Sequence, residues 1–222
     1  MRVLIIGGTS GLGLELAKLL KKREAEVWVT GRSSNQIPAG IHFYSLAITE
    51  NIDDLRKSLD TLVTQVLPVD LVIFAAGFFE QGHLDELHDV HIETMLHVGL
   101  AVPALVLQRI LARQAFFAGV LGITSTSQWI AREREPLYSA TKAGLAMLLN
   151  SASLDSRIHK TLVVGPAGMK TNFWKGAERE GHALLAPEEV AEKILALWDD
   201  IYTFRLARIL RDPLRVEILE NR

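Results

Sequence analysis

The sequence predicts an α/β protein built on one doubly wound parallel sheet, with helices on both faces. Two observations support this prediction. Short apolar, β-branched runs alternate with longer stretches of helical apolar spacing along the chain. A glycine-rich turn joins the first apolar run to the first helical stretch. We expect about six to seven strands and a single domain over residues 1–222.

The composition excludes several classes of protein. The net charge is −2 and charged residues make up 23% of the chain, so no nucleic-acid partner is indicated. The absence of cysteine excludes disulfides and thiol catalysis. We identify neither a signal peptide nor an apolar run of the ~20 residues that a membrane helix needs. The expectation is an ordered, cytoplasmic protein without a membrane partner.

The first strand and helix are predicted around the sequence VLIIGGTSGLG, from Val3 to Gly13. Val3 to Ile6 is a buried strand, and Leu14 to Lys22 continues with helical spacing. Glycines between them allow a tight turn, a close backbone approach to a pyrophosphate, and close packing of helix on sheet. The first amides of the helix then face the phosphates. The expected contacts come from Gly7, Thr9, Ser10, Gly11, Leu12 and Gly13.

The remaining elements follow in order. Further strands are predicted at 27–30, 41–46, 69–75, 118–124 and 161–164, and helices at 51–66, 84–112, 137–156 and from 187 to about 198. Pro68 ends the first of these helices, Pro103 breaks or kinks the second, and Pro187 opens the last. The tail 205–215 has arginine at every third or fourth position, and either an edge strand or a helix fits it.

Three side chains suited to proton transfer lie after the fifth strand. Ser125 follows the strand directly, and Tyr138 and Lys142 share one helix face at i and i+4. Ligands bind at the carboxyl ends of the strands in such sheets. The 13-residue spacing between Ser125 and Tyr138 includes a loop that can bring the two hydroxyls together. The alternative is an ordinary helix pair beside a loop serine.

With the glycine turn and the sequence Ala75-Ala76-Gly77 after the fourth strand, these residues resemble the short-chain dehydrogenase/reductase family from residue 1 to about residue 200. The resemblance implies a Rossmann-type sheet, a nicotinamide cofactor, and Tyr138 as the acid/base. A nearby ammonium favours the phenolate, so Lys142 is expected to tune Tyr138. By resemblance, Lys142 also holds the nicotinamide ribose. Ser125 is expected to stabilise charge on the substrate oxygen.

The chain departs from the family pattern at several positions. His97 stands where many members carry an asparagine that supports a proton relay, and it either keeps the relay in altered form or only packs. Ala75 replaces the asparagine of Asn-Ala-Gly, Ala167 replaces the glycine of Pro-Gly, and Ala47 replaces an acidic residue beside adenine. The resemblance adds further cofactor contacts, from Ala75, Ala76, Gly77, Pro166, Met169 and Thr171.

The end of the second strand indicates which cofactor binds. A carboxylate there accepts a ribose 2′-hydroxyl and repels a 2′-phosphate. This chain has Gly31-Arg32-Ser33-Ser34 instead. Arg32 can pair with the phosphate and lie on the adenine, with Ser33 beside it. NADP(H) is therefore the predicted cofactor; the alternative is a solvated surface arginine.

The leading prediction is an NADP(H)-dependent oxidoreductase that interconverts a small carbonyl compound and its alcohol. The alternative is a non-catalytic NADP(H)-binding sensor or scaffold. Aromatic residues after the strand ends favour an apolar substrate, although lid or subunit contacts fit them as well: Phe78, Phe79, Trp129, Phe173 and Trp174. Apolar positions on helices 84–112 and 137–156 predict a homodimer or homotetramer. No metal site is expected at His83, His88 and His91.

Overall fold

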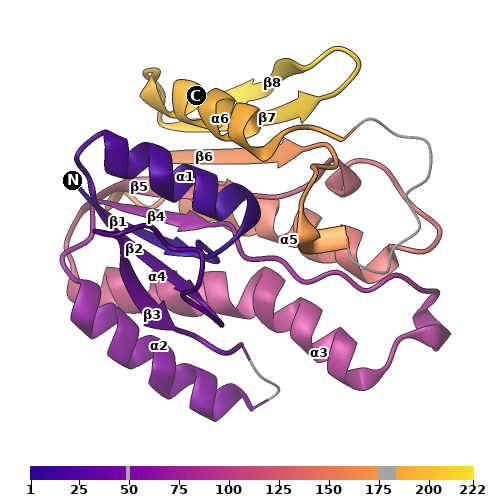
Figure 1. Ribbon diagram of the computed structural model, residues 1–222, viewed down its shortest axis with the longest axis horizontal. Helices are drawn as coiled ribbons and strands as arrows, with labels where there is room; N and C mark the ends of the chain where they lie inside the picture. Colours follow the sequence, from indigo (N-terminus) through magenta and orange to yellow (C-terminus); the bar gives the residue numbers. More distant parts are fainter. Residues whose placement is uncertain (49–50, 175–183) are drawn as a thin grey trace.

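The computed structural model describes residues 1–48, 51–174 and 184–222 (Figure 1). Its centre is one sheet in the order β3-β2-β1-β4-β5-β6-β7-β8. All neighbouring strands from β3 to β7 are parallel. The strands are β1 (Arg2–Ile6), β2 (Glu26–Gly31), β3 (His42–Ser45), β4 (Leu71–Phe74), β5 (Phe117–Ile123), β6 (Ile158–Pro166), β7 (Phe204–Leu210) and β8 (Arg215–Asn221).

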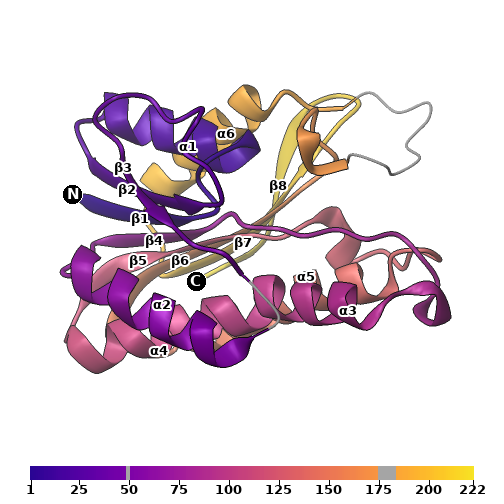
Figure 2. The same ribbon diagram turned by 60° about the horizontal axis from the view of Figure 1, so that its bottom comes forward.

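Helices cover both faces of this sheet, as predicted. In Figure 2 the helices α1 (Gly11–Lys22) and α6 (Pro187–Asp199) lie on one side. The other side carries α2 (Ile52–Val66), α4 (Val102–Arg113) and α5 (Pro136–Ala152). Each face buries its own apolar cluster, one under α1 and α6 and one under α2, α4 and α5. The α/β, doubly wound prediction is therefore confirmed.

The local sequence explains where these elements begin. The four residues of β4, LVIF, are all buried, as expected for a central strand with helices on both faces. At the start of α2, the Asn51 side chain accepts hydrogen bonds from the amides of Asp53 and Asp54 at 3.0 and 3.3 Å. These two acids also complement the helix dipole. Apolar pattern and capping together set the boundaries.

The tail differs from the prediction in strand number and direction. Residues 205–215 lie almost entirely in β7 and the turn after it, and β8 pairs with β7 in the antiparallel direction. The sheet thus has eight strands among the described residues, with one antiparallel edge. The reason is visible in β7, where buried and half-buried residues alternate with period two. The arginine spacing concealed this alternation.

The predicted helix 84–112 is wrong in its start and in the position of its break. Leu84–Glu86 forms a separate 3₁₀ turn, and the long helix begins with α3 (Asp89–Leu96). A π-helical segment, His97–Ala101, joins α3 to α4, and the Val102 amide donates to the His97 carbonyl. Pro103 lacks an amide hydrogen and sits inside the first turn of α4, so the irregularity falls just before it.

Among the described residues, the stretch Asp89–Arg113 is long and apolar enough to cross a membrane by length and composition alone. Core helices of other proteins pass the same test, and 44% of its apolar window is buried against the rest of the protein. Length and composition alone therefore do not place it in a membrane.

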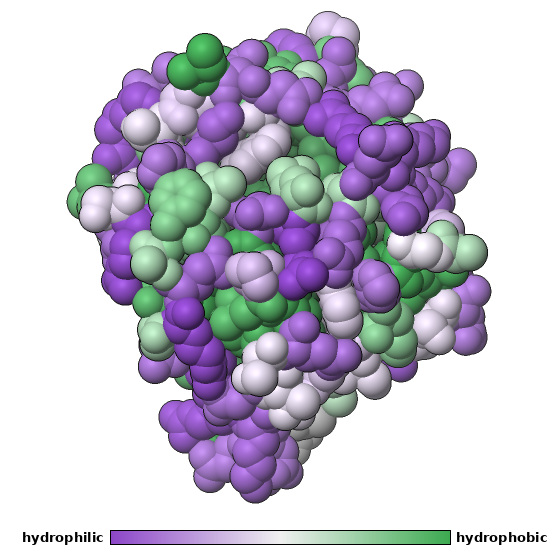
Figure 3. All heavy atoms as spheres, turned by 90° about the vertical axis from the view of Figure 1, so that its left-hand side faces the viewer, coloured by the Kyte–Doolittle hydropathy of each residue, from purple (hydrophilic) through white to green (hydrophobic). Residues whose placement is uncertain are grey.

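The two ends of the sheet differ in what they present. At the amino ends of the strands, polar side chains cover most of the surface, with apolar groups in the gaps between them (Figure 3). At the opposite, carboxyl ends, the segments after β4, β5 and β6 extend beyond the sheet (Figure 1). Most residues predicted to bind the cofactor and substrate lie in these segments and in the turn after β1. Arg32 and Ser33 follow β2, and Tyr138 and Lys142 lie on α5.

Candidate functional site

The turn between β1 and α1 is built from backbone groups packed against one another. Gly7 has a φ of +86°, and a Cβ placed on it would lie 2.5 Å from the Ala76 backbone. A Cβ on Gly13 would lie 2.2 Å from the Gly7 carbonyl oxygen. Neither position has room for a side chain, so glycine is required at both. The Gly7 amide donates to Thr30 Oγ1 at 3.2 Å, which ties the turn to the end of β2.

The start of α1 is suited to an anion. Ser10 is the N-cap, and its side chain makes no capping hydrogen bond. The first turn of the helix contains no acidic residue, and its amides point out of the helix end. A Cβ on Gly11 would lie 3.3 Å from the Thr171 side chain, so the segment after β6 lies over this turn. Dipole and amides together fit a phosphate group.

Arg32 lies beside this turn. Thr9 packs so closely on Gly31 that a Cβ on Gly31 would be 2.2 Å from Thr9 Oγ1. Arg32 follows Gly31 directly and is exposed. The next residue, Ser33, accepts a hydrogen bond from the Asn35 amide at 3.3 Å. Arg32 therefore lies one residue from the contact between Gly31 and Thr9, and its side chain is exposed to solvent.

The end of β4 is held against β1. The amides of Ala75 and Ala76 both donate to the Ile6 carbonyl, at 2.9 and 2.7 Å. A Cβ on the following Gly77 would lie 2.8 Å from the Phe173 ring and 3.8 Å from Lys142 Nζ. The segments after β4 and β6 therefore meet beside Lys142. The Ala75 hydrogen bond uses the backbone amide, so it forms with an alanine at this position as it would with an asparagine.

Tyr138 and Lys142 lie close together on the inner face of α5. Both side chains are buried, and Lys142 Nζ lies 5.7 Å from the centre of the Tyr138 ring. Lys142 Nζ donates to the Ile123 carbonyl at the end of β5, at 3.1 Å. Burial lowers the pKa of Lys142 to about 8, because the charged amine loses its water. The amine can therefore hold or release a proton near neutral pH.

Aromatic rings surround Tyr138. The Phe79 ring meets the Tyr138 ring edge-on, with centres 5.0 Å apart. Phe173 and Trp174 lie 6.0 and 6.4 Å away, and Trp174 also contacts Phe79 at 5.1 Å. Trp174 is fixed by a hydrogen bond from its indole nitrogen to the Met169 carbonyl, at 3.0 Å. These rings place apolar surface around the phenol.

Ser125 belongs to a hydrogen-bonded chain that the sequence analysis missed. Ser125 Oγ accepts from the Ser127 amide at 3.1 Å and lies 3.2 Å from Ser127 Oγ. Ser127 Oγ in turn lies 3.1 Å from Glu135 Oε2. All three residues are buried. An acid placed immediately before a helix-opening proline, Glu135-Pro136, was the available sequence signal, because such an acid sits at the N-cap.

His97 lies at the start of the π-helical segment, and this segment packs against α5. A Cβ on Gly99 would lie 2.8 Å from the Thr141 side chain, which puts the two helices in close contact beside the Tyr138–Lys142 pair. Short π segments inside helices are frequent at functional sites. The π-helical segment that begins at His97 therefore lies beside the Tyr138–Lys142 pair.

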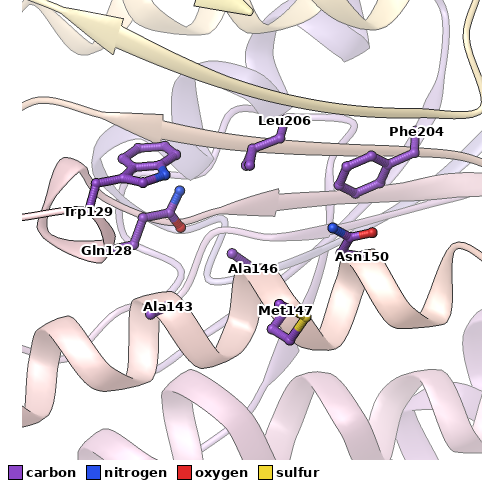
Figure 4. A pocket seen from close by; sticks show the side chains of 8 residues that line it. All are labelled: Gln128, Trp129, Ala143, Ala146, Met147, Asn150, Phe204 and Leu206. Atoms are coloured by element: carbon purple, nitrogen blue, oxygen red, sulfur yellow. The ribbon is translucent and has the colours of Figure 1, made fainter. Parts of the chain in front are cut away.

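Two other features lie apart from these residues. Among the described residues, no three His, Cys, Asp or Glu side chains could together hold a metal ion. A groove of about 180 Å³ lies between α5 and β7, and Gln128 and Trp129 form one end of it (Figure 4). The remaining lining residues are Ala143, Ala146, Met147, Asn150, Phe204 and Leu206. The α5 residues that line this groove are not among the buried residues of the helix, which include Tyr138 and Lys142.

The sheet order, the glycine turn and the buried Tyr138–Lys142 pair define a dinucleotide-binding α/β protein with a side-chain cluster suited to proton transfer. A family model described as short chain dehydrogenase matches residues 1–181. The chain therefore belongs to the short-chain dehydrogenase/reductase family of oxidoreductases.

Individual relatives are distant in sequence and close in fold. An uncharacterized oxidoreductase of Staphylococcus haemolyticus is 25% identical over 210 residues, which cover 86% of this chain and 88% of the relative. A short-chain dehydrogenase of Sphingobium yanoikuyae in complex with NADPH has a TM-score of 0.78 at 19% identity, covering 89% and 84% of the two chains. A 4-hydroxyisoleucine dehydrogenase complexed with NADH has a TM-score of 0.78 at 19% identity, covering 94% and 96%.

Proposed function

We propose that this chain is an NADP(H)-dependent oxidoreductase that interconverts a carbonyl group and an alcohol on a small, largely apolar substrate. One domain over residues 1–222 carries both binding and catalysis. The main support is the burial of Tyr138 beside Lys142, next to the point where the segments after β4 and β6 meet. When bound, the nicotinamide cofactor supplies or accepts the hydride.

The residues of the chain handle the proton and the charge. Tyr138 donates its phenolic proton to the carbonyl oxygen during reduction and takes it back during oxidation. Lys142 favours the phenolate when protonated and also holds the nicotinamide ribose. Ser125 hydrogen-bonds the same substrate oxygen and stabilises the charge that develops on it. His97 is the proposed entry point for a proton that replaces the one Tyr138 gives up.

We assign the cofactor contacts to the same region of the protein. The amides at the start of α1, with Thr9, Ser10 and Leu12 nearby, hold the pyrophosphate. The ends of β4 and β6 hold the nicotinamide half, through Gly77, Pro166, Met169 and Thr171. Arg32 and Ser33 hold the 2′-phosphate, because an arginine pairs with phosphate and no carboxylate stands there to repel it. One structural neighbour is complexed with NADPH and another with NADH, so the fold is compatible with either cofactor, and we assign the preference to Arg32.

The substrate and the assembly are proposed on the distribution of apolar surface. Phe79, Phe173 and Trp174 surround the phenol, which favours a substrate with an apolar body. Leu96 on α3 and Met147 on α5 are exposed at 39% and 64%, and exposed apolar groups on adjacent helices favour a homodimer or homotetramer. We place the protein in the cytoplasm.

A panel of aldehydes and ketones with NADPH tests the activity, read by the loss of NADPH absorbance. We expect turnover of aryl or alkyl ketones and little turnover of charged ones. A second function, a non-catalytic NADP(H) sensor, is favoured by one observation: this chain has His97 at the position where the family pattern has an asparagine. NADPH binding with no turnover of any carbonyl or alcohol would support the sensor and exclude the enzyme.

A further inference from the structure

Glu135 is the one buried carboxylate among the described residues, with 7% of its surface exposed. Burying a carboxylate costs free energy unless hydrogen bonds and opposite charges compensate it. Ser127 Oγ lies 3.1 Å from Glu135 Oε2, and Arg132 Nε lies 3.6 Å from the same oxygen. The reaction proposed above assigns no role to this carboxylate, so its burial calls for an explanation.

The chemistry of a carboxylate fixes the direction of the hydrogen bonds that lead away from it. An ionised carboxylate only accepts, so the Ser127 hydroxyl donates to Glu135. The Ser127 oxygen is then left to accept from the Ser125 hydroxyl, 3.2 Å away, until a substrate oxygen takes the Ser125 hydrogen in its place. The Ser127 amide also donates to Ser125 Oγ at 3.1 Å. Two contacts from Ser127 thus fix the Ser125 side chain, and Glu135 fixes the Ser127 hydroxyl.

Glu135 joins this chain to the helix that carries Tyr138. It is the N-cap of α5, directly before Pro136 and three residues before Tyr138. Its carbonyl accepts from the Ser139 amide at 2.9 Å, in the first turn of the helix. The loop after β5 and the start of α5 are therefore linked through side chains, at the level of Ser125 and Tyr138.

We propose that Glu135 is a positioning residue, which sets the Ser125 hydroxyl in register with the Tyr138 phenol by holding Ser127. The inference rests on the proposed carbonyl–alcohol reaction, in which both hydroxyls contact the reacting oxygen. A displacement of about 1 Å at such a site can lower the rate about 10²-fold. Loss of Glu135 therefore acts on turnover and leaves the cofactor contacts around Gly7, Gly13 and Arg32 intact.

A positioning role differs from an acid/base role in the effect of glutamine. Glu135→Gln keeps an oxygen that accepts from the Ser127 hydroxyl, but it has no titrating proton. A positioning residue therefore tolerates glutamine and does not tolerate alanine. An acid/base residue tolerates neither. The exposed neighbour Glu133, whose side chain is 84% exposed, gives a matched control in the same segment.

The experiment compares Glu135→Ala, Glu135→Gln, Ser127→Ala, the Ser127→Ala/Glu135→Ala double variant and Glu133→Ala in carbonyl reduction with NADPH. We expect Glu135→Ala and Ser127→Ala each to lower kcat about 10- to 100-fold, with the KM for NADPH within about two-fold. The double variant should lose no more than the worse single variant, because both residues act through one chain. Glu135→Gln should stay within about five-fold of the wild type, and Glu133→Ala should equal it.

Two results would overturn the proposal: glutamine as inactive as alanine, or losses that multiply in the double variant. Urea unfolding of the same proteins gives a readout that does not need turnover. The loss of midpoint in the double variant should be smaller than the sum of the two single losses. If the wild type turns over no carbonyl or alcohol, the proposed function fails, but the urea midpoints still test the contact between Glu135 and Ser127. Additive losses of midpoint would show that Glu135 does not hold Ser127.

Discussion

The two halves of the candidate site are built in different ways. The half around the β1–α1 turn consists of backbone, where Gly7 and Gly13 leave no room for a Cβ. The half at the ends of β5 and α5 consists of buried polar side chains, among them Ser125 and Lys142. The first half acts through shape and free amides. The second acts through groups that exchange protons and are costly to bury.

This difference predicts which property each substitution changes. A change in the backbone half disturbs packing, and with it both stability and cofactor binding. A change in the side-chain half removes chemistry while the fold and the contacts with the pyrophosphate remain. At Lys142 it also removes the proposed ribose contact and a burial cost. Four substitutions test the distinction, from the largest expected effect to the smallest.

Tyr138→Phe should have the largest effect. The variant keeps the ring and its contacts with Phe79 and Phe173, and it loses only the hydroxyl. Because a positioned acid contributes about 10²- to 10⁴-fold, kcat should fall by that factor. NADPH affinity, measured by the quenching of protein fluorescence, should change little. Undiminished turnover would overturn the proposed mechanism, and lost NADPH binding would show that the two halves are not separate.

Lys142→Met should stabilise the protein and abolish most turnover. Burial lowers the pKa of Lys142 from 10.5 to about 8, so the charged amine destabilises the fold at every pH below about 8. This cost disappears as pH rises from 8 to 10.5. The difference in unfolding free energy between variant and wild type should therefore shift by about 3 kcal/mol between pH 7 and pH 10.5.

Urea unfolding at several pH values measures this shift, and the exposed Lys22→Met provides the control. The Lys22 variant should follow the wild type throughout, because an exposed amine keeps its water. If the unfolding free energies of Lys142→Met and the wild type change in parallel with pH, burial does not lower the pKa of Lys142. The charged Lys142 side chain would then not destabilise the fold.

The sequence was sufficient for the parts of the site that depend on pattern. The run Val3–Ile6, the glycines after it and the i, i+4 spacing of Tyr138 and Lys142 each predicted the observed placement. It was insufficient where tertiary contacts decide. In the sequence, Glu135 is one of several charged residues in its segment. Only the fold shows that it is buried and hydrogen-bonded to Ser127. The start of the long helix at Asp89 likewise depends on packing, because the apolar pattern continues back to Leu84.

Gly13→Ala should act on packing and therefore on both stability and binding. The new methyl group would lie 2.2 Å from the Gly7 carbonyl oxygen, so the helix must move away from the turn. Overpacking of this kind costs about 1–3 kcal/mol of unfolding free energy. Urea unfolding should show that loss, and NADPH titration should show weaker binding. Gly82→Ala is the control, because its nearest neighbours at 3.3 Å are ends of the Glu86 and Leu87 side chains, which can move.

Arg32→Asp should have the smallest effect, and it should change the choice of cofactor. Arg32 is exposed at the edge of the backbone half, so its charge acts through solvent and its replacement leaves the turn intact. A carboxylate at this position repels a 2′-phosphate and accepts a 2′-hydroxyl. We expect NADPH binding to weaken about 10-fold, which corresponds to about 1.4 kcal/mol, and NADH binding to strengthen. Arg56→Asp, on the surface of α2, changes the net charge equally and should alter neither affinity. Isothermal titration of the wild type and the two variants with both cofactors gives the six constants needed. A wild type that binds NADH as tightly as NADPH would show that Arg32 is only a solvated surface residue, and the backbone half would then recognise the pyrophosphate alone.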